Sequence, residues 1–287
     1  MSVTGRPFAL PDGSTALEYV LPAGTTEQDF YLGRGDRIVG RPDAIVEGSL
    51  KVTGTGCSII GRPGWSFRGR GGQAGAWQVS ADGFTAKVGR LDVHGTPNRQ
   101  GIQILFCSGF DLDIEEIVAL GPDATHHFDS PYHYHAIYPE GCRDGRIMVG
   151  RIADVPDGYG VHCYGGEVTG LVVDIGRIER CSGGIMCYGP QIHGNRFHVG
   201  SYADLGPEGL TPYDLRGKGA YDNAITVGGA SPPPPPPPPS QPDVPEAIRL
   251  LRESLDTYFV GQLHYTVDRA KKTRAYRALV AIGGSWR

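Results

Sequence analysis

The group of residues best suited by type to chemistry is a histidine-rich segment in the middle of the chain, Thr125-HHFDSPYHYHAIYPEG. Imidazole nitrogens and a carboxylate are ligands that Zn²⁺ and similar ions prefer. The segment contains neither HExxH nor another recognised zinc spacing, and histidine and tyrosine are also frequent in loops that contact sugars or proteins. A metal site, a binding loop and a structural loop therefore all stay open. The candidate metal ligands are His126, His127, Asp129, His133 and His135.

Acidic residues that alternate with apolar ones form a second candidate site. Asp111 and Asp113 are separated by one residue, so an extended strand would place them on the same side, about 7 Å apart at Cα. Asp174 holds the position equivalent to Asp113 in a later, similar segment. Glycosidases use two carboxyl groups about 5 to 9.5 Å apart, so this set could cleave a glycan. Acids that alternate along a solvated strand also occur without any catalytic role, and both interpretations stay open.

Tyrosines and their neighbours form a third candidate, for binding rather than catalysis. Exposed aromatic rings on a sheet commonly stack on the apolar faces of sugar rings. The alternative is that another part of the chain covers these rings. The predicted glycan-binding residues are Tyr132, Tyr134, Tyr138, Glu140, His162, Tyr164 and Tyr188.

Most of these residues lie in a repeat that combines a glycine with alternating apolar and polar positions. Its copies are Gly83-FTAKVGRL, Gly109-FDLDIEEI, Gly145-RIMVGRI, Gly170-LVVDIGRI and Gly194-NRFHVGSY. The glycines are 26, 36, 25 and 24 residues apart, and the longest interval holds an extra stretch near 121–134 that predicts one long loop. Alternation with period two predicts strands with one buried face.

A second short strand is predicted ahead of several copies, at Gly101-IQIL, Ala136-IYPE, Gly160-VHCY and Gly184-IMCY. A repeat of about 24 residues with two or three short strands is typical of a coil of parallel strands, in which equivalent residues stack into ladders. Cys163 and Cys187 are predicted as buried, reduced thiols in such a ladder. The predicted fold class is therefore all-β, a solenoid of about six to eight coils. Its predicted inner ladder is Ile102, Ile137, Val161 and Ile185.

Together with the opening Phe30-YLGRGDRIVGRP and Gly54-TGCSIIGRPG, these coils resemble the pectin-lyase-like superfamily of right-handed parallel β-helices over residues 25–230. That superfamily includes pectate lyases, polygalacturonases, phage tailspikes and adhesins, so the resemblance implies the fold and leaves the function open. Pectate lyase chemistry would need clustered acids for calcium and an arginine base. The chain offers a predicted outward ladder that charge-compensated stacking also explains, formed by Arg90, Glu116, Arg151 and Arg177.

The sequence divides the chain into four parts. Residues 1–24 are predicted as a lead-in or cap, and residues 25–230 as the β-helix. Residues 231–244 form a linker in which Pro232–Pro239 predict a polyproline II rod about 25 Å long. Residues 245–287 are predicted to be a helical C-terminal segment because of an apolar stripe at helical spacing, formed by Ile248, Leu251, Leu255 and Tyr258.

Charge and targeting signals narrow the function classes. The net charge of −4 argues against a general nucleic-acid-binding protein. Residues 241–287 carry eight Lys/Arg and five Asp/Glu, a net of +3, which leaves −7 on residues 1–240 and suggests different neighbours for the two parts. The sequence shows no secretory signal pattern and no apolar window long enough to span a membrane. It contains no recognised cofactor motif, so no cofactor is predicted.

The resemblance is greatest to bacteriophage tail appendages of the tailspike type, because a β-helix is stiff, resists proteolysis and presents a long side to glycans. We therefore expect a virion structural protein (a tail fibre, a spike or a minor tail protein) made in the host cytoplasm. Its body would contact host-surface polysaccharide, and residues 241–287 would dock on other tail proteins, with a homotrimer as an open alternative. The alternative function is a polysaccharide-degrading enzyme, a glycoside hydrolase or a lyase, that acts on bacterial surface glycans.

Overall fold

The computed structural model describes residues 3–61, 65–69, 76–93, 100–118, 135–205 and 212–229, apart from the side chains of residues 156 and 157. The chain divides into two compact units, Met1–Pro234 and Pro235–Arg287, and all described residues belong to the first. Every regular element within them is a β-strand, so the described part of the chain is all-β, as predicted. The predicted proline linker and helical C-terminal segment lie outside the described residues.

The strands from β1 to β10 are short, as expected for a glycine-rich sequence dense in turns. Their bounds are β1 (Arg6–Ala9), β2 (Thr15–Leu21), β3 (Gly24–Glu27), β4 (Phe30–Leu32), β5 (Arg37–Gly40), β6 (Ala44–Gly48), β7 (Leu50–Val52), β8 (Ser58–Ile60), β9 (Ser66–Gly69) and β10 (Trp77–Val79). The strands that follow include two long ones, β15 and β17, each of which covers two predicted strands. The bounds of these later strands are β11 (Thr85–Asp92), β12 (Ile102–Leu105), β13 (Asp111–Val118), β14 (Ile137–Glu140), β15 (Arg146–Tyr164), β16 (Val168–Thr169), β17 (Val172–Tyr188), β18 (Ile192–His193), β19 (Arg196–Ala203), β20 (Tyr213–Gly217) and β21 (Ala224–Val227).

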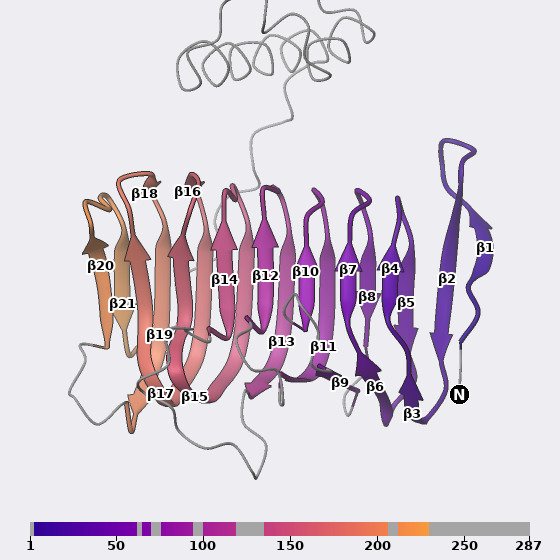
Figure 1. Ribbon diagram of the computed structural model, residues 1–287, viewed down its shortest axis with the longest axis horizontal. Coiled ribbons are helices and arrows are strands. Elements are labelled where there is room, and N and C mark those ends of the chain that lie inside the picture. Colours follow the sequence, from indigo (N-terminus) through magenta and orange to yellow (C-terminus); the bar gives the residue numbers. More distant parts are fainter. Residues whose placement is uncertain are drawn as a thin grey trace, which may run out of the picture. The chain divides into compact units, whose positions relative to one another are not determined.

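Parallel pairing between successive repeats organises the strands. Nineteen strands join one sheet, and β16 and β18 form a separate pair. β1 pairs antiparallel with β2, whereas every other pairing among the described strands is parallel. Equivalent residues lie in register, so that Gln78 faces Gln103 and Gln103 faces Tyr138. Figure 1 shows these strands side by side through the described unit.

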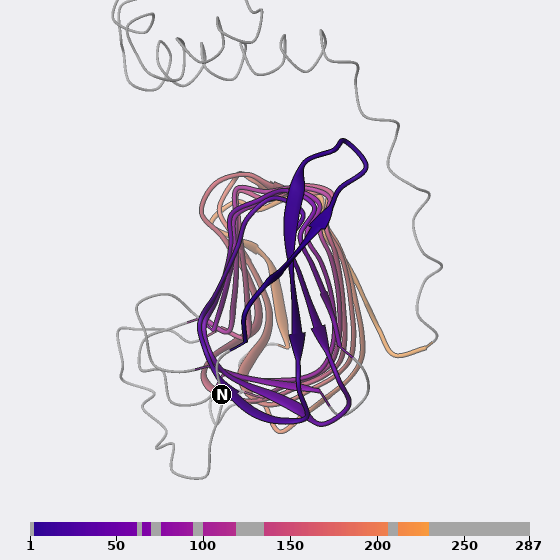
Figure 2. The ribbon, with the colours of Figure 1, turned by 90° about the vertical axis from the view of Figure 1, so that its right-hand side faces the viewer.

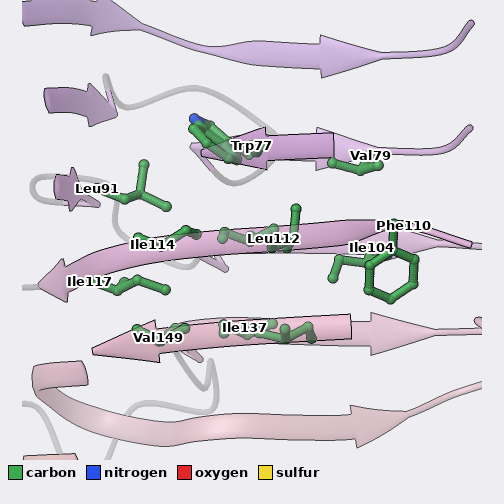
Figure 3. Close-up of a cluster of buried hydrophobic side chains, with 14 of the residues drawn as sticks. Trp77, Val79, Leu91, Ile104, Phe110, Leu112, Ile114, Ile117, Ile137 and Val149 are labelled. Carbon is green, nitrogen blue, oxygen red and sulfur yellow. The ribbon is translucent and has the colours of Figure 1, made fainter. Parts of the chain in front are cut away.

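The core lies in the space that the strands of successive repeats enclose, and Figure 2 shows these strands superposed around it. Figure 3 shows how apolar side chains from neighbouring strands meet there, as Ile114 of β13 meets Val149 of β15. Burial of such pairs in repeat after repeat is the main source of stability. The predicted inner ladder is confirmed, because its four members are fully buried and pair in register: Ile102, Ile137, Val161 and Ile185.

All six cysteines are free and buried. Cys163 and Cys187 pair in register on β15 and β17, which confirms the prediction of buried thiols in a ladder. Burial raises the pKa of Cys57 to about 11 and that of Cys181 to about 12. These two thiols therefore stay protonated at neutral pH and act as small apolar side chains.

Three glycines allow the backbones of neighbouring repeats to approach closely, and we call them the glycine ladder: Gly150, Gly176 and Gly200. A Cβ on Gly176 would lie 2.5 Å from the carbonyl oxygen of Gly150. The same distance separates a Cβ on Gly150 from the Glu115 carbonyl oxygen, and a Cβ on Gly200 from that of Gly176. Glycine is therefore required at these positions because any side chain would meet the backbone of the preceding repeat.

Candidate functional site

Six aromatic side chains from β14, β15, β17 and the residue two positions before β14 are in contact with one another, and we call this cluster the aromatic face. The alternation of the strands explains the positions of His162 and Tyr164, because Val161 and Cys163 are buried in the core while the residues between and after them point outward. His135 and Tyr159 instead have the parity of the buried positions Ile137 and Val161. Parallel register then places equivalent outward residues next to each other, as it does for Tyr164 and Tyr188. The aromatic face consists of His135, Tyr138, Tyr159, His162, Tyr164 and Tyr188.

The rings of the aromatic face form one continuous series of contacts. The ring centroids of Tyr138 and His162 are 5.8 Å apart, and those of His162 and Tyr164 are 5.6 Å apart with an interplanar angle of 26°. Tyr188 continues the series, with its centroid 5.6 Å from that of Tyr164. Tyr164 is 44% exposed, whereas His135 is 3% exposed. The aromatic face therefore combines a buried base with a ring that solvent reaches.

Two charged residues border the aromatic face. Glu140 is the last residue of β14, and burial raises the pKa of its carboxyl group. Lys218 follows β20, and its Nζ lies 5.0 Å from the centroid of the Tyr188 ring. A hydrogen bond with Tyr188 raises the pKa of Lys218, and burial raises the pKa of Tyr138 to about 12. At neutral pH the aromatic face thus offers ring faces, the hydroxyl donor of Tyr138 and, at its border, a positive amine.

His135 and His162 form a hydrogen-bonded pair within the aromatic face. His135 Nε2 lies 2.7 Å from His162 Nδ1. The backbone N–H of Tyr159 donates to His135 Nδ1 at 3.1 Å, and the backbone N–H of His135 donates to the Gln100 side-chain oxygen at 2.9 Å. Both ring nitrogens of His135 are therefore engaged, and the ring is held between two strands.

The structure brings together five of the seven residues predicted to bind a glycan, and Tyr132 and Tyr134 lie outside the described residues. Sequence reasoning missed Tyr159, which precedes the glycine of its strand and reaches the aromatic face through a register shift between Val155 and Tyr159. It also missed Lys218, which belongs to the last, irregular repeat. The five that come together are Tyr138, Glu140, His162, Tyr164 and Tyr188.

The metal prediction concerns residues that the structure describes only in part. Of the five predicted ligands, only His135 is described, and the others lie in the 119–134 stretch: His126, His127, Asp129 and His133. A metal at His135 would have to displace one of the two hydrogen bonds that its ring nitrogens make. Among the described residues there is no group of three or more His, Cys, Asp or Glu that could hold a metal ion. The metal site therefore stays a prediction.

The three aspartates predicted for catalysis lie on β13 and in the first half of β17, and each has a partner of its own. In the register, Met148 stands between Asp113 and Asp174, so these two carboxylates are not neighbours. Catalysis by these residues stays a prediction, because ladder pairing accounts for them equally well. The closest nitrogen–oxygen pairs are Asp111 with Arg146 at 3.5 Å, Asp113 with Lys87 at 3.2 Å and Asp174 with His198 at 2.8 Å.

The predicted arginine ladder is charge-compensated, as expected from the acid within it. Glu116 pairs with Arg90 at 2.9 Å and also with Arg151 of the next repeat. The Glu179 carboxylate accepts a hydrogen bond from the Arg151 guanidinium, and its Oε2 also lies 2.5 Å from Arg177 Nε. These contacts lower the pKa of Glu179 to about 2, with the hydrogen bond from Arg151 as the largest cause. The ladder therefore holds neighbouring repeats together and needs no catalytic explanation.

Comparison with known proteins gives no family assignment: no family model, no curated protein and no solved structure matches this chain. Within the described ranges there is also no helix long and apolar enough to cross a membrane.

Proposed function

We propose that residues 25–230 form a right-handed parallel β-helix whose aromatic face binds a carbohydrate. The in-register parallel pairs and the buried ladders support the solenoid, since each repeat buries its apolar side against the next. We propose the right-handed sense because connections between parallel strands are right-handed in nearly all proteins. The outward residues of the same repeats are then free of any role in the core and can serve a ligand.

The observation that carries the binding proposal is the continuous series of rings across β14, β15 and β17. Sugar rings have an apolar face that stacks on aromatic side chains and an edge of hydroxyl groups that needs hydrogen-bond partners. Tyr138, Tyr164 and Tyr188 supply ring faces and hydroxyl groups, and Glu140 and Lys218 stand at the border. The aromatic face thus offers both kinds of contact that a sugar ring needs.

A binding assay tests this proposal. We would incubate the full chain with a panel of bacterial surface polysaccharides and measure the affinity of the wild type and of Tyr164→Ala. Loss of one stacking ring should lower the affinity about tenfold, because a stacking contact contributes up to about 1.5 kcal/mol. The control is Tyr31→Ala, which removes a 68% exposed tyrosine on β4, outside the aromatic face. Equal effects of the two variants, or no binding by the wild type across a broad panel, would refute carbohydrate binding by this face.

We propose further that this carbohydrate-binding β-helix is part of a bacteriophage virion and that residues 241–287 dock on other tail proteins. The support is the resemblance of the coils, the stiffness of a solenoid and the eight consecutive prolines, which favour a rod that holds two parts apart. The test is immunogold labelling of particles in the lysate of cells that carry the native gene. Labelled tails would support the assignment, and label confined to soluble protein would refute it.

A further inference from the structure

The hydrogen bonds of His135 determine where its ring proton lies. A backbone N–H can only donate, so His135 Nδ1, which receives the N–H of Tyr159 at 3.1 Å, has no proton of its own. A neutral imidazole carries one ring proton, which must then be on His135 Nε2. That nitrogen faces His162 Nδ1 at 2.7 Å.

The proton position of His162 follows from that of His135. Since His135 Nε2 carries the proton between the two rings, His162 Nδ1 is the acceptor. The proton of a neutral His162 must therefore be on Nε2. A single backbone N–H, that of Tyr159, thus fixes the proton positions of two successive histidine rings.

The surroundings hold both rings in place. The His135 ring stacks on that of Tyr138 with an interplanar angle of 10° and is 3% exposed. The His162 ring stacks on Tyr164 and lies 6.4 Å from Tyr188, so it is at the centre of the aromatic face. A ring flip of either histidine would exchange a nitrogen for a carbon in these hydrogen bonds. The two hydrogen bonds at His135 Nδ1 and between the rings are therefore compatible with one orientation of each ring.

We propose that His135 is a positioning residue of the aromatic face, which fixes His162 as the tautomer with its proton on Nε2. His162 Nε2 then takes only an acceptor oxygen as its partner, whether from the protein or from a ligand. His135 itself lies beneath the face and acts through His162. The role in ligand binding rests on the proposed carbohydrate function, whereas the tautomer itself does not.

Nitrogen-15 NMR of the histidine rings in the full chain tests the tautomer directly. At about pH 8, where a histidine of ordinary pKa near 6.5 is neutral, wild-type His162 should show a protonated Nε2 and a bare Nδ1. The variant His135→Phe keeps a buried ring and removes both nitrogens, so His162 should then show a mixture of the two tautomers. A wild-type His162 with its proton on Nδ1 would overturn the proposal, and this measurement does not depend on whether the variant folds.

The matched control is His193→Phe, which removes another histidine that stacks on a tyrosine, Tyr221, at 4.8 Å and outside the aromatic face. In His193→Phe the nitrogen-15 signals of His162 should be the same as in the wild type. For a polysaccharide that the wild type binds, His135→Phe should lower the affinity about tenfold and His193→Phe should leave it unchanged. Equal affinities of the two variants would refute the role in binding. If no polysaccharide binds the wild type, the carbohydrate proposal fails, and the spectrum still decides the tautomer.

Discussion

Replacement of Gly176 by alanine tests whether the repeats need glycine for space. The added Cβ would lie 2.5 Å from the carbonyl oxygen of Gly150, about 0.9 Å closer than the 3.4 Å at which ordinary contact begins. The clash is with backbone, which cannot turn away as a side chain would. Overpacking of this kind costs about 1 to 3 kcal/mol.

A smaller effect opposes this cost. Alanine has fewer conformations than glycine in the unfolded chain, which stabilises the folded state by about 0.4 to 1 kcal/mol. The expected net change for Gly176→Ala is a loss of about 1 to 2 kcal/mol in the free energy of unfolding. For a unit of this size, that loss lowers Tm by about 2 to 8 °C.

Thermal unfolding followed by circular dichroism measures the change, with Gly33→Ala as the matched control. The nearest atom to a Cβ on Gly33 is Asp36 Oδ2 at 3.4 Å, an ordinary contact. The control should therefore unfold at the wild-type temperature or slightly above it. If Gly176→Ala is as stable as Gly33→Ala, close approach is not the reason for glycine in the ladder, and the spacing argument is wrong.

Three further predictions follow from burial and charge. Ellman's reagent at about pH 8 should react with none of the six buried thiols of the native protein and with all six in denaturant; fast native reaction would contradict their burial. Glu179 has its pKa lowered from 4.5 to about 2 by Arg151, so the stability it contributes is complete above pH 4.5 and is lost as the pH falls towards 2. In Glu179→Gln the free energy of unfolding should therefore fall less steeply between pH 4.5 and 2 than in the wild type. An unchanged dependence on pH would show that Glu179 does not contribute to acid unfolding. Asp113→Asn breaks an exposed pair with Lys87 and should cost less than about 1 kcal/mol in urea unfolding. In an assay for new reducing ends, cleavage that this variant abolishes would establish the enzymatic alternative.

The regular part of the fold could be predicted from the sequence because each repeat has the same alternation of apolar and polar residues. Ile102, Val161 and their equivalents alternate with polar residues, and parallel stacking needs only that these positions recur. The compensation of Arg151 by Glu116 was predictable for the same reason, since equivalent outward positions become neighbours. Local alternation and a constant interval therefore carry most of the information about the ladders.

The base of the aromatic face could not be predicted in this way. The sequence interpretation places His135 in a loop that could hold a metal, bind a ligand or have a structural role only, and the structure buries its side chain against Tyr138 and Tyr159. The contact with Tyr159 depends on the register shift after Val155, and no local pattern marks that shift. Long-range register across repeats of unequal length is the missing information.

The position of the aromatic face within the repeats supports its functional interpretation. The residues that break the pattern are concentrated at this place: the extra stretch of the 36-residue interval comes just before β14 in the sequence, and a buried histidine precedes that strand. A solenoid that served only as a spacer would gain nothing from a polar ring pair beneath a row of tyrosines, because an apolar ladder is simpler to satisfy. Departures from local rules are expected at functional sites. The His135–His162 pair is such a departure: His135 is buried, and its hydrogen bond connects it to His162 within the face that we propose binds the ligand.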